Sequence, residues 1–312
     1  MFHTGGMVGT SPVAYRGMLF VGSWDEHLYA LEPYTGALIW SHSAGGGIAS
    51  TPAAADGRVF FGTHQGVVLC LDSESGCERW SFQTDGAVTG SPTPHSGVLF
   101  AGSCDGALYS LNAETGEPLW RFQTGGMITS SPTVEDGVVF IGSHDGTLHA
   151  VHAESGEPLW RFQTQAPVVS SPTVFGEDVL FGSNDFRVYC IARETGEKRW
   201  SFATSGQVTA SPVAAAEMVL AGSTDHRLYS IDPATGEELW RFSTGGWVWS
   251  APVVLDDTAI FGSYDGCLYA VNIHSGRELW SFQTEDIIHG TPLACCGMLF
   301  FGSLDGGLYA LE

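Results

Sequence analysis

The sequence predicts an all-β protein, an eight-bladed β-propeller whose blades are four-stranded antiparallel sheets. Three observations predict this fold. Tryptophan recurs with a period of 40 residues and no insertion or deletion, at Trp40, Trp80, Trp120, Trp160, Trp200, Trp240 and Trp280. Proline keeps the same period at Pro12, Pro52, Pro92, Pro132, Pro172, Pro212, Pro252 and Pro292. Each repeat also contains short apolar runs and Gly-containing turns, and repeats of about 40–50 residues with this content are typical of propeller blades.

Each repeat is expected to form four strands. Within residues 127–164, four runs are rich in β-branched and aromatic residues, namely 128–134, 138–143, 147–152 and 158–164. The turns between them read Glu-Asp-Gly, His-Asp-Gly and Glu-Ser-Gly. The runs are too short for helices and show no helical period. Four antiparallel strands joined by tight turns make a meander, which is one blade.

The residues that recur from repeat to repeat are expected to build the blade. Gly156 follows Ser in the third turn, where glycine supplies a positive φ without steric cost. Asp145 recurs in seven repeats, and a short carboxylate in a turn can accept hydrogen bonds from nearby backbone N–H groups. This turn role fits the recurrence better than a ring of metal-binding carboxylates. Trp160 offers a large flat surface to bury between one blade and the next.

Closure of the ring is expected to use both chain ends. Eight prolines imply eight repeats, but the last repeat has no third turn and no Trp. Phe2 falls at the fourth-strand position of Phe82 and Phe122. We therefore expect residues 1–4 to pair with the strand 308–312, which leaves no open sheet edge between the chain ends. Because this seam has no Trp, it should be the weakest contact between blades.

The repeat and the charge of the chain indicate one domain and argue against a nucleic-acid-binding protein. The unbroken repeat predicts one domain over residues 1–312. Net charge is −22, with 12 basic against 34 acidic residues, which argues against binding to a nucleic-acid backbone. Many of the acids fall in the first-to-second and third-to-fourth turns, which share one face of the ring, the lower face. We expect this acidity to serve solubility rather than a basic partner.

The sequence does not fix the localisation of the protein, but its cysteine usage favours the cytoplasm. No apolar run approaches transmembrane length, and the N-terminus shows no signal-peptide pattern. Seven cysteines occupy unlike positions of the repeat, and an odd, scattered set suits free thiols in a reducing compartment. No CxxC pair and no zinc-ligand spacing occurs. We expect a monomer without a membrane span.

One sequence string carries a family resemblance. The string from Leu108 to Phe122, LYSLNAETGEPLWRF, occurs in related form in the other repeats. It resembles the tryptophan-docking repeat of the pyrroloquinoline-quinone (PQQ)-like β-propellers, which include quinoprotein dehydrogenases and non-catalytic relatives. The resemblance covers the whole chain and implies the eight-bladed fold. It does not imply one function, because proteins that share a fold differ in their sites.

For the dehydrogenases of that family, the resemblance implies long insertions between blades, an Asp base and a calcium ion held by Glu and Asn. This chain has no such insertions, and none of its residues can be matched to those ligands. Cys295 and Cys296 are adjacent, like the vicinal disulfide that lies against the quinone in several of those enzymes. They fall in a first-to-second turn on the lower face, where we expect an ordinary surface hairpin.

Residues that break the repeat are the candidates for function. The second-to-third turns and the connections between blades should share the opposite face of the ring, the upper face. There Trp247 and Trp249 stand where most other repeats carry small residues. Trp, Tyr and Arg dominate binding hot spots, so exposed aromatic side chains among polar groups suit a recognition surface. The candidate ligand-binding residues are Trp24, His27, His64, Arg187, Arg227, Trp247, Trp249, Tyr264 and His289.

Three functional hypotheses remain open. The first is a non-catalytic scaffold that binds a protein, a peptide or a small ligand on the upper face, without a cofactor. The second is a PQQ-binding protein with calcium, in which Trp247 or Trp249 stacks on the quinone and Arg187 or Arg227 meets its carboxylates. The third is a recently amplified or engineered scaffold with no evolved ligand. Apart from these hypotheses, the alternative to a recognition surface is that Trp249 only plugs the central channel.

Other chemistries have little support in the sequence. Metal binding by His289, His27 and His64 is possible but has no spacing signature. No Ser/His/Asp or Cys/His arrangement stands out in this composition, so hydrolytic catalysis is not predicted. We therefore expect a protein that is not an enzyme.

Overall fold

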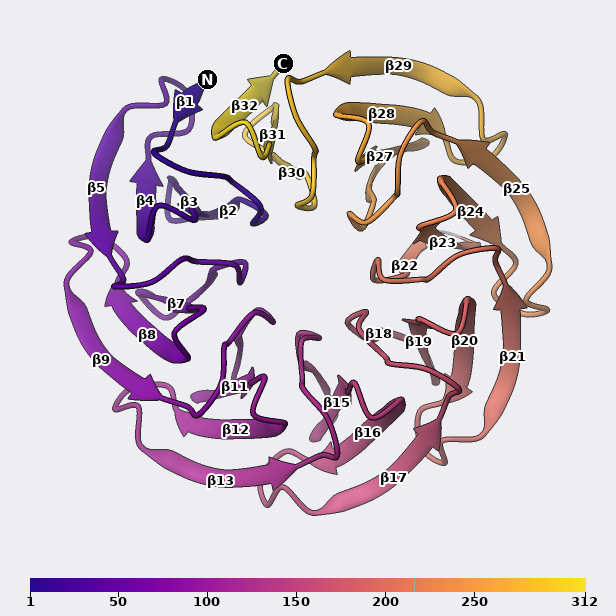
Figure 1. Ribbon diagram of the computed structural model, residues 1–312, viewed down its shortest axis with the longest axis horizontal. Coiled ribbons are helices and arrows are strands. Elements are labelled where there is room, and N and C mark those ends of the chain that lie inside the picture. Colours follow the sequence, from indigo (N-terminus) through magenta and orange to yellow (C-terminus); the bar gives the residue numbers. More distant parts are fainter. Residues whose placement is uncertain (216) are drawn as a thin grey trace.

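The computed structural model is a ring of eight four-stranded antiparallel sheets around a central axis (Figure 1). It describes residues 1–215 and 217–312. The described residues contain strands and turns and no helix, so none forms a helix able to cross a membrane. The predicted eight-bladed β-propeller is confirmed.

The first four blades follow the chain. Blade 1 comprises β2 (Val13–Tyr15), β3 (Met18–Gly22), β4 (His27–Leu31) and β5 (Leu38–Ser43). Blade 2 comprises β6 (Ala53–Ala55), β7 (Arg58–Gly62), β8 (Val67–Asp72) and β9 (Glu78–Gln83). Blade 3 comprises β10 (Thr93–His95), β11 (Val98–Gly102), β12 (Ala107–Asn112) and β13 (Pro118–Gln123). Blade 4 comprises β14 (Thr133–Glu135), β15 (Val138–Gly142), β16 (Thr147–His152) and β17 (Pro158–Gln163).

The last four blades complete the ring, and the eighth also uses the N-terminal strand. Blade 5 comprises β18 (Thr173–Phe175), β19 (Asp178–Ser183), β20 (Arg187–Ala192) and β21 (Lys198–Ala203). Blade 6 comprises β22 (Val213–Ala215), β23 (Met218–Ser223), β24 (Arg227–Ile231) and β25 (Glu238–Ser243). Blade 7 comprises β26 (Val253–Leu255), β27 (Thr258–Gly262), β28 (Cys267–Asn272) and β29 (Glu278–Gln283). Blade 8 comprises β30 (Leu293–Cys295), β31 (Met298–Gly302), β32 (Gly307–Leu311) and β1 (Phe2–His3).

The innermost strand of each blade is shorter than the sequence predicts. In blade 4 the expected strand 128–134 is reduced to β14, Thr133–Glu135. Pro132 has no N–H to donate to a neighbouring strand. The N–H of Ser131 instead donates to the hydroxyl oxygen of Ser171 in the next blade, at 2.9 Å. The residues before the proline therefore link neighbouring blades around the channel rather than pair within one sheet.

The core lies between the blades, and the recurrent Trp covers six of the boundaries, from that between blades 1 and 2 to that between blades 6 and 7. Trp80 is 8 % exposed, its Nε1 donates to the carbonyl of Ala113 at 3.2 Å, and it packs with Phe60, Leu99 and other buried side chains of blades 2 and 3. Its ring lies against Gly116, whose φ is +75° and where any Cβ would lie 2.7 Å from the indole. The same Trp–Gly contact recurs in the pairs Trp40–Gly76, Trp120–Gly156, Trp160–Gly196, Trp200–Gly236 and Trp240–Gly276.

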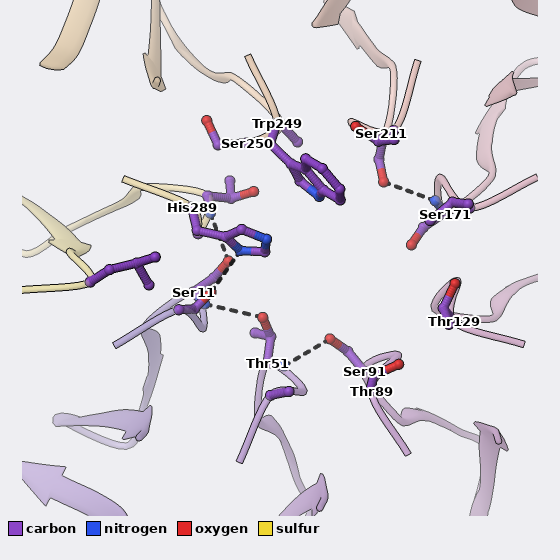
Figure 2. Close-up of a pocket in the computed structure, with 18 of the residues that line it drawn as sticks. Ser11, Thr51, Thr89, Ser91, Thr129, Ser171, Ser211, Trp249, Ser250 and His289 are labelled. Carbon is purple, nitrogen blue, oxygen red and sulfur yellow. Dashed lines mark hydrogen bonds between the residues drawn. The ribbon is translucent and has the colours of Figure 1, made fainter. Parts of the chain in front are cut away.

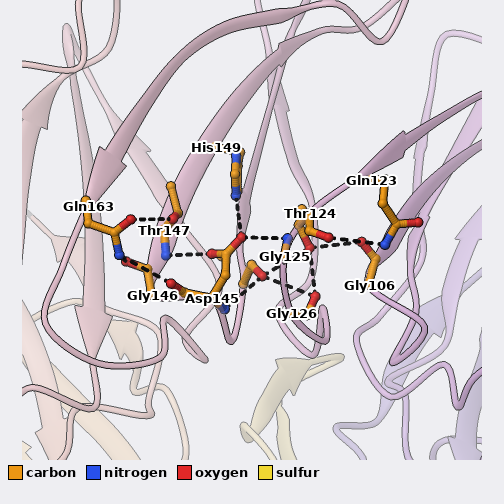
Figure 3. A network of polar contacts seen from close by, with 12 residues as sticks. Gly106, Gln123, Thr124, Gly125, Gly126, Asp145, Gly146, Thr147, His149 and Gln163 are labelled. Carbon is orange, nitrogen blue, oxygen red and sulfur yellow. Dashed lines mark hydrogen bonds and ion pairs between the residues drawn. The ribbon is translucent and has the colours of Figure 1, made fainter.

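The recurrent Asp organises the turn between the second and third strands, as predicted (Figure 3). Asp145 Oδ1 accepts from the N–H of Thr147 at 2.9 Å, and Oδ2 accepts from the N–H of Gly125 at 2.9 Å. His149 Nε2 lies 3.2 Å from the same Oδ2. Burial of Asp145 opposes its ionisation, but the hydrogen bonds from Gly125 and Thr147 and the nearby His149 outweigh burial and lower its pKa. Most other blades have Tyr at the position of His149, as in the Tyr109–Asp105 bond of 2.7 Å.

The N-terminal strand closes the ring, but over a shorter stretch than predicted. Phe2 pairs with Leu308 and His3 with Gly307, and the N–H of Thr4 donates to the carbonyl of Gly306 at 3.0 Å. The expectation of pairing along 308–312 is therefore wrong beyond Leu308. Among the described residues, the paired positions of β1 and β32 are Phe2 with Leu308 and His3 with Gly307. The two ends meet side by side in blade 8 (Figure 1).

Candidate functional site

The upper face of the ring is formed by the loops that the sequence assigns to it. The N–H of Trp24, in a second-to-third turn, donates to the carbonyl of Met7 in a connection between blades, at 3.0 Å. His144 and Met127 form the same bond at 2.8 Å. Because the two kinds of loop are paired by their backbones, residues that break the repeat in either kind lie on one face.

A cavity of about 450 Å³ occupies the central channel at this face (Figure 2). A ring of hydroxyl side chains lines part of it. The N–H of Ser11 donates to Thr51 Oγ1 at 3.2 Å, and the N–H of Thr51 donates to Ser91 Oγ at 3.1 Å. Similar bonds continue around the axis as far as Ser211. The next equivalent residue is Ala251, which has no hydroxyl to accept the following bond.

Aromatic side chains line the other part of the channel mouth. Trp249 and His289 project into the channel in Figure 2, with ring centroids 5.6 Å apart. Tyr264 stacks on Trp249 at 5.7 Å with an interplanar angle of 13°. Trp247 lies 5.3 Å from Tyr264 and 6.3 Å from Trp249. These four rings come from the connections into blades 7 and 8 and from one turn of blade 7.

The aromatic wall continues across the seam into blades 1 and 2. His289 Nδ1 lies 3.1 Å from the carbonyl oxygen of Gly9. A Cβ at Gly9 would lie 3.6 Å from Trp24 Nε1, so Trp24 is the next ring along. The rings of Trp24 and His64 are 4.4 Å apart. We call the six residues Trp247, Tyr264, Trp249, His289, Trp24 and His64 the aromatic arc.

The arc combines exposure with low charge. Trp24 is 42 % and Trp247 43 % exposed, and the other members are half-buried. Burial lowers the pKa of His289, although its contact with the Gly9 carbonyl opposes this, so the imidazole is neutral at pH 7. Burial raises the pKa of the Tyr264 phenol to about 12, so it keeps its proton. The centre of the arc therefore presents uncharged aromatic surface.

Three of the predicted site residues lie elsewhere on the ring. His27, Arg187 and Arg227 each begin a third strand, where they pair with the end of the outer strand of the blade. Arg187 Nη1 lies 3.4 Å from Ser201 Oγ, and Arg227 Nη1 lies 3.4 Å from Tyr229 Oη. The structure thus brings six of the nine predicted residues together at the channel mouth and leaves these three beside the outer strands.

Two further residues belong to this face although they were not predicted as site residues. Leu304 lines the channel cavity and lies 3.5 Å from the Cβ position of Gly9, beside Trp24. Phe186 is 46 % exposed with a φ of 70°, where five blades have glycine. Both break the repeat, so the same comparison of equivalent positions could have found them.

Comparison with known proteins identifies the family. The family model for the β-propeller of the beta-alanine-activating enzyme matches residues 53–259. The chain belongs to this family. A search of curated proteins found no match.

Solved structures of other members of the fold superpose on nearly the whole chain. The computationally designed Ika8 protein has a TM-score of 0.89 at 17 % identity, covering 100 % of this chain and 98 % of its own. BamB from Moraxella catarrhalis has a TM-score of 0.85 at 18 % identity, with 99 % and 98 % covered. Quinohemoprotein alcohol dehydrogenase ADHIIG from Pseudomonas putida HK5 has a TM-score of 0.80 at 15 % identity, with 96 % and 70 % covered. At these identities the likeness supports a PQQ-like propeller fold and nothing finer.

The residues of this family member do not fit PQQ as the second hypothesis places it. Arg187 bonds to Ser201 of the outer strand β21, and Arg227 bonds to Tyr229 of its own strand β24, rather than to groups of the arc. Across residues 1–215 and 217–312, no three His, Cys, Asp or Glu side chains gather in a group able to hold a metal ion. Cys295 and Cys296 carry free thiols in the lower-face turn. We therefore derive no chemistry through a quinone.

Proposed function

We propose that this propeller is a non-catalytic binding module whose ligand lies against the aromatic arc at the upper mouth of the channel. The observation that carries the proposal is the continuity of the arc. Six rings from blades 7, 8, 1 and 2 follow one another at positions where the other blades mostly have smaller side chains. The blades without these rings adopt the same fold, so the rings are not required by the scaffold.

The chemistry of the cavity favours an uncharged ligand group that is aromatic or apolar on one side. Stacking on Trp249 and Tyr264 suits such a group, because flat rings add specific contacts to the burial of apolar surface. Across the channel, each Ser or Thr hydroxyl that accepts a backbone N–H keeps its own proton to donate. A peptide side chain with nearby backbone carbonyls has both features, and a small ligand with an apolar ring and a carbonyl also has them.

A selection experiment tests the proposal without a known ligand. A displayed peptide library is selected on the immobilised propeller, with counter-selection on the variant carrying Trp247→Met and Trp249→Thr, the residues found at the equivalent positions of blade 4. We expect enriched peptides to share an aromatic or large apolar residue and to bind the variant at least about tenfold more weakly.

The matched control changes residues at the mouth of the channel in blade 4, away from the aromatic arc. The variant Met127→Ala, Thr129→Ala removes side chains from the equivalent positions of blade 4. The selected peptides should bind it as tightly as the unchanged protein. Peptides that bind all three proteins equally, or a selection that enriches nothing, would favour the third hypothesis, a scaffold without an evolved ligand.

A further inference from the structure

A largely buried arginine breaks the repeat on the lower face. Arg58 begins β7, and its side chain is 16 % exposed. The scaffold does not require a charge at this position, because five of the seven other blades have Met or Val there. The equivalent residues are Met18, Val98, Val138, Asp178, Met218, Thr258 and Met298. Arg58 is therefore a candidate for a role other than folding.

The guanidinium of Arg58 forms no hydrogen bond with the residues that the structure describes, and its Nε is buried without a partner. Its Nη2 lies 3.7 Å from Oε1 of Glu114, which is too far for a hydrogen bond. Asp72 lies opposite Arg58 in the neighbouring strand, but its carboxylate accepts from Arg79 and from the N–H of Ser75. Because buried polar groups normally find partners, the five N–H donors of this guanidinium can serve a ligand.

Arg58 lines a cavity of about 330 Å³ between blades 2 and 3, which are neighbours in the ring (Figure 1). The first-to-second turns of both blades and the third-to-fourth turn of blade 3 form its walls, so it opens on the lower face. Its volume lies at the lower end of the range for small-molecule sites. The apolar part of the lining comes from Ala55, Phe60, Pro94 and Ala113. We call this cavity the Arg58 pocket.

The side-chain amide of Asn112 adds a second donor to the lining of the Arg58 pocket. Its Oδ1 accepts from the N–H of Glu114 at 2.8 Å and from that of Thr115 at 3.1 Å. Because these bonds engage the oxygen, Nδ2 is the part of the amide that can meet a ligand. The pocket thus offers a guanidinium and an amide N–H to an acceptor, beside an apolar wall.

The charges around the pocket favour an anion with a single negative charge. A carboxylate matches the planar guanidinium, which can donate two parallel hydrogen bonds to it. Asp56 and Glu114 also line the pocket, and the chain has a net charge of −22, so a multiply charged anion would be repelled. Both of these acidic residues are exposed, so solvent weakens their effect on a single charge.

We propose that the Arg58 pocket binds a small monocarboxylate with a short apolar chain. The carboxylate accepts hydrogen bonds from the Arg58 guanidinium and from Asn112 Nδ2, and the apolar chain lies against Ala55 and Pro94. The pocket shares no lining residue with the channel cavity, so this site is independent of the aromatic arc and of the function proposed for it.

The test uses butyrate as the probe and butyramide, which has nearly the same shape and no charge, as its matched control. We expect saturable binding of butyrate to the full chain in ligand-observed NMR at about 0.1 M salt, which screens distant acidic side chains. Butyramide should bind at least about tenfold more weakly, because it forms no charge-assisted pair with the guanidinium. Equal binding of the two compounds, or tighter binding of inorganic phosphate than of butyrate, would overturn the proposal.

Three protein variants locate the probe on the ring. Arg58→Met introduces the residue found at Met18 and should weaken butyrate binding at least about tenfold. Glu114→Gln removes a competing carboxylate and should strengthen binding about threefold. Arg193→Ala changes an arginine that is already paired with Asp136 at 2.9 Å, so it should leave butyrate binding unchanged.

The exposed position of Glu114 keeps the test decisive even if Arg58→Met folds poorly. Failure of butyrate to bind both the unchanged protein and the Glu114→Gln variant would show that the pocket is not a carboxylate site. Butyrate binding that Arg58→Met leaves intact, in a variant with an unchanged melting temperature, would equally contradict the proposal.

Discussion

At the scale of single residues, tryptophan has two roles in this protein, which differ in the groups that the indole contacts. Trp120 covers Gly156 and donates to the carbonyl of Ala153 at 3.0 Å. Trp249 instead meets the rings of Tyr264 and His289 at the channel mouth. The first arrangement recurs at six boundaries and belongs to the scaffold. The second occurs once, which is why we assign it to recognition.

The scaffold role predicts unequal costs for two equivalent substitutions. Trp120→Ala should lower the free energy of unfolding by about 3–5 kcal/mol, because it empties a packed boundary and removes a hydrogen bond. Trp280→Ala should lower it by less than about 1 kcal/mol, because this indole is 40 % exposed and has no glycine beneath it. Denaturant unfolding of both variants checks the difference. Similar losses would mean that Trp280 is docked in solution.

A buried histidine predicts pH-dependent stability. Burial lowers the pKa of His149 below its ordinary value, although Asp145 opposes this. Between the folded and the unfolded pKa, the folded protein therefore binds fewer protons than the unfolded chain. The stability that depends on neutral His149 is complete above about pH 6.5 and is lost as pH falls through the folded pKa. His149→Tyr restores the residue found at Tyr109 and should reduce the fall in unfolding free energy between pH 7.5 and pH 5. An unchanged fall would contradict this assignment.

At the scale of elements, the two-residue strand β1 closes the ring. Phe2 pairs with Leu308, and its ring lies 5.3 Å from that of Tyr29, a contact that Phe82 makes with Tyr109 at 5.4 Å. Deletion of residues 1–6 should therefore expose more of the edge of β32. We expect a lower melting temperature or concentration-dependent association, measured by calorimetry and sedimentation. A truncated chain that is equally stable and monomeric would show that β1 does not close the ring.

The sequence predicts the start of a strand well where turns separate the apolar runs. It predicts the start less well where residues before the strand form hydrogen bonds to a neighbouring blade. The second and third strands of blade 4 begin at Val138 and Thr147, as expected. The first strand begins at Thr133, because Ser131 and Pro132 serve the links between blades. The period of 40 residues shows that these residues belong to the repeat, but it does not identify the residues that they contact.

At the scale of the whole molecule, the free thiols provide a check on packing. All seven cysteines are unpaired, and Cys70 and Cys190 are buried. Burial raises the pKa of both thiols to about 12. We expect thiol titration of the unfolded, unreduced protein to find seven free thiols, with Cys70 and Cys190 unreactive in the native state. Three or fewer thiols in the unfolded protein would contradict the structure.

The candidate site was only partly predictable from sequence. Departure from the repeat identified Trp247, Trp249 and His289, and strand order placed them on the upper face. It could not tell that Arg187 would lie beside an outer strand, because its position begins the third strand, where it pairs with Ala203. The repeat and the predicted closure of the ring place His289 and Gly9 at equivalent positions of neighbouring blades, but they do not show that the imidazole meets the Gly9 carbonyl.

The central claim is that the aromatic arc serves recognition rather than folding. The unfolding free energy of the variant carrying Trp247→Met and Trp249→Thr tests this most directly, because both new residues already occur at the equivalent positions of blade 4. We predict that denaturant unfolding gives a value within about 1 kcal/mol of the unchanged protein, as for most surface substitutions. A loss of several kcal/mol would show that the two tryptophans are packing elements of the channel, and the arc would then not be a recognition site.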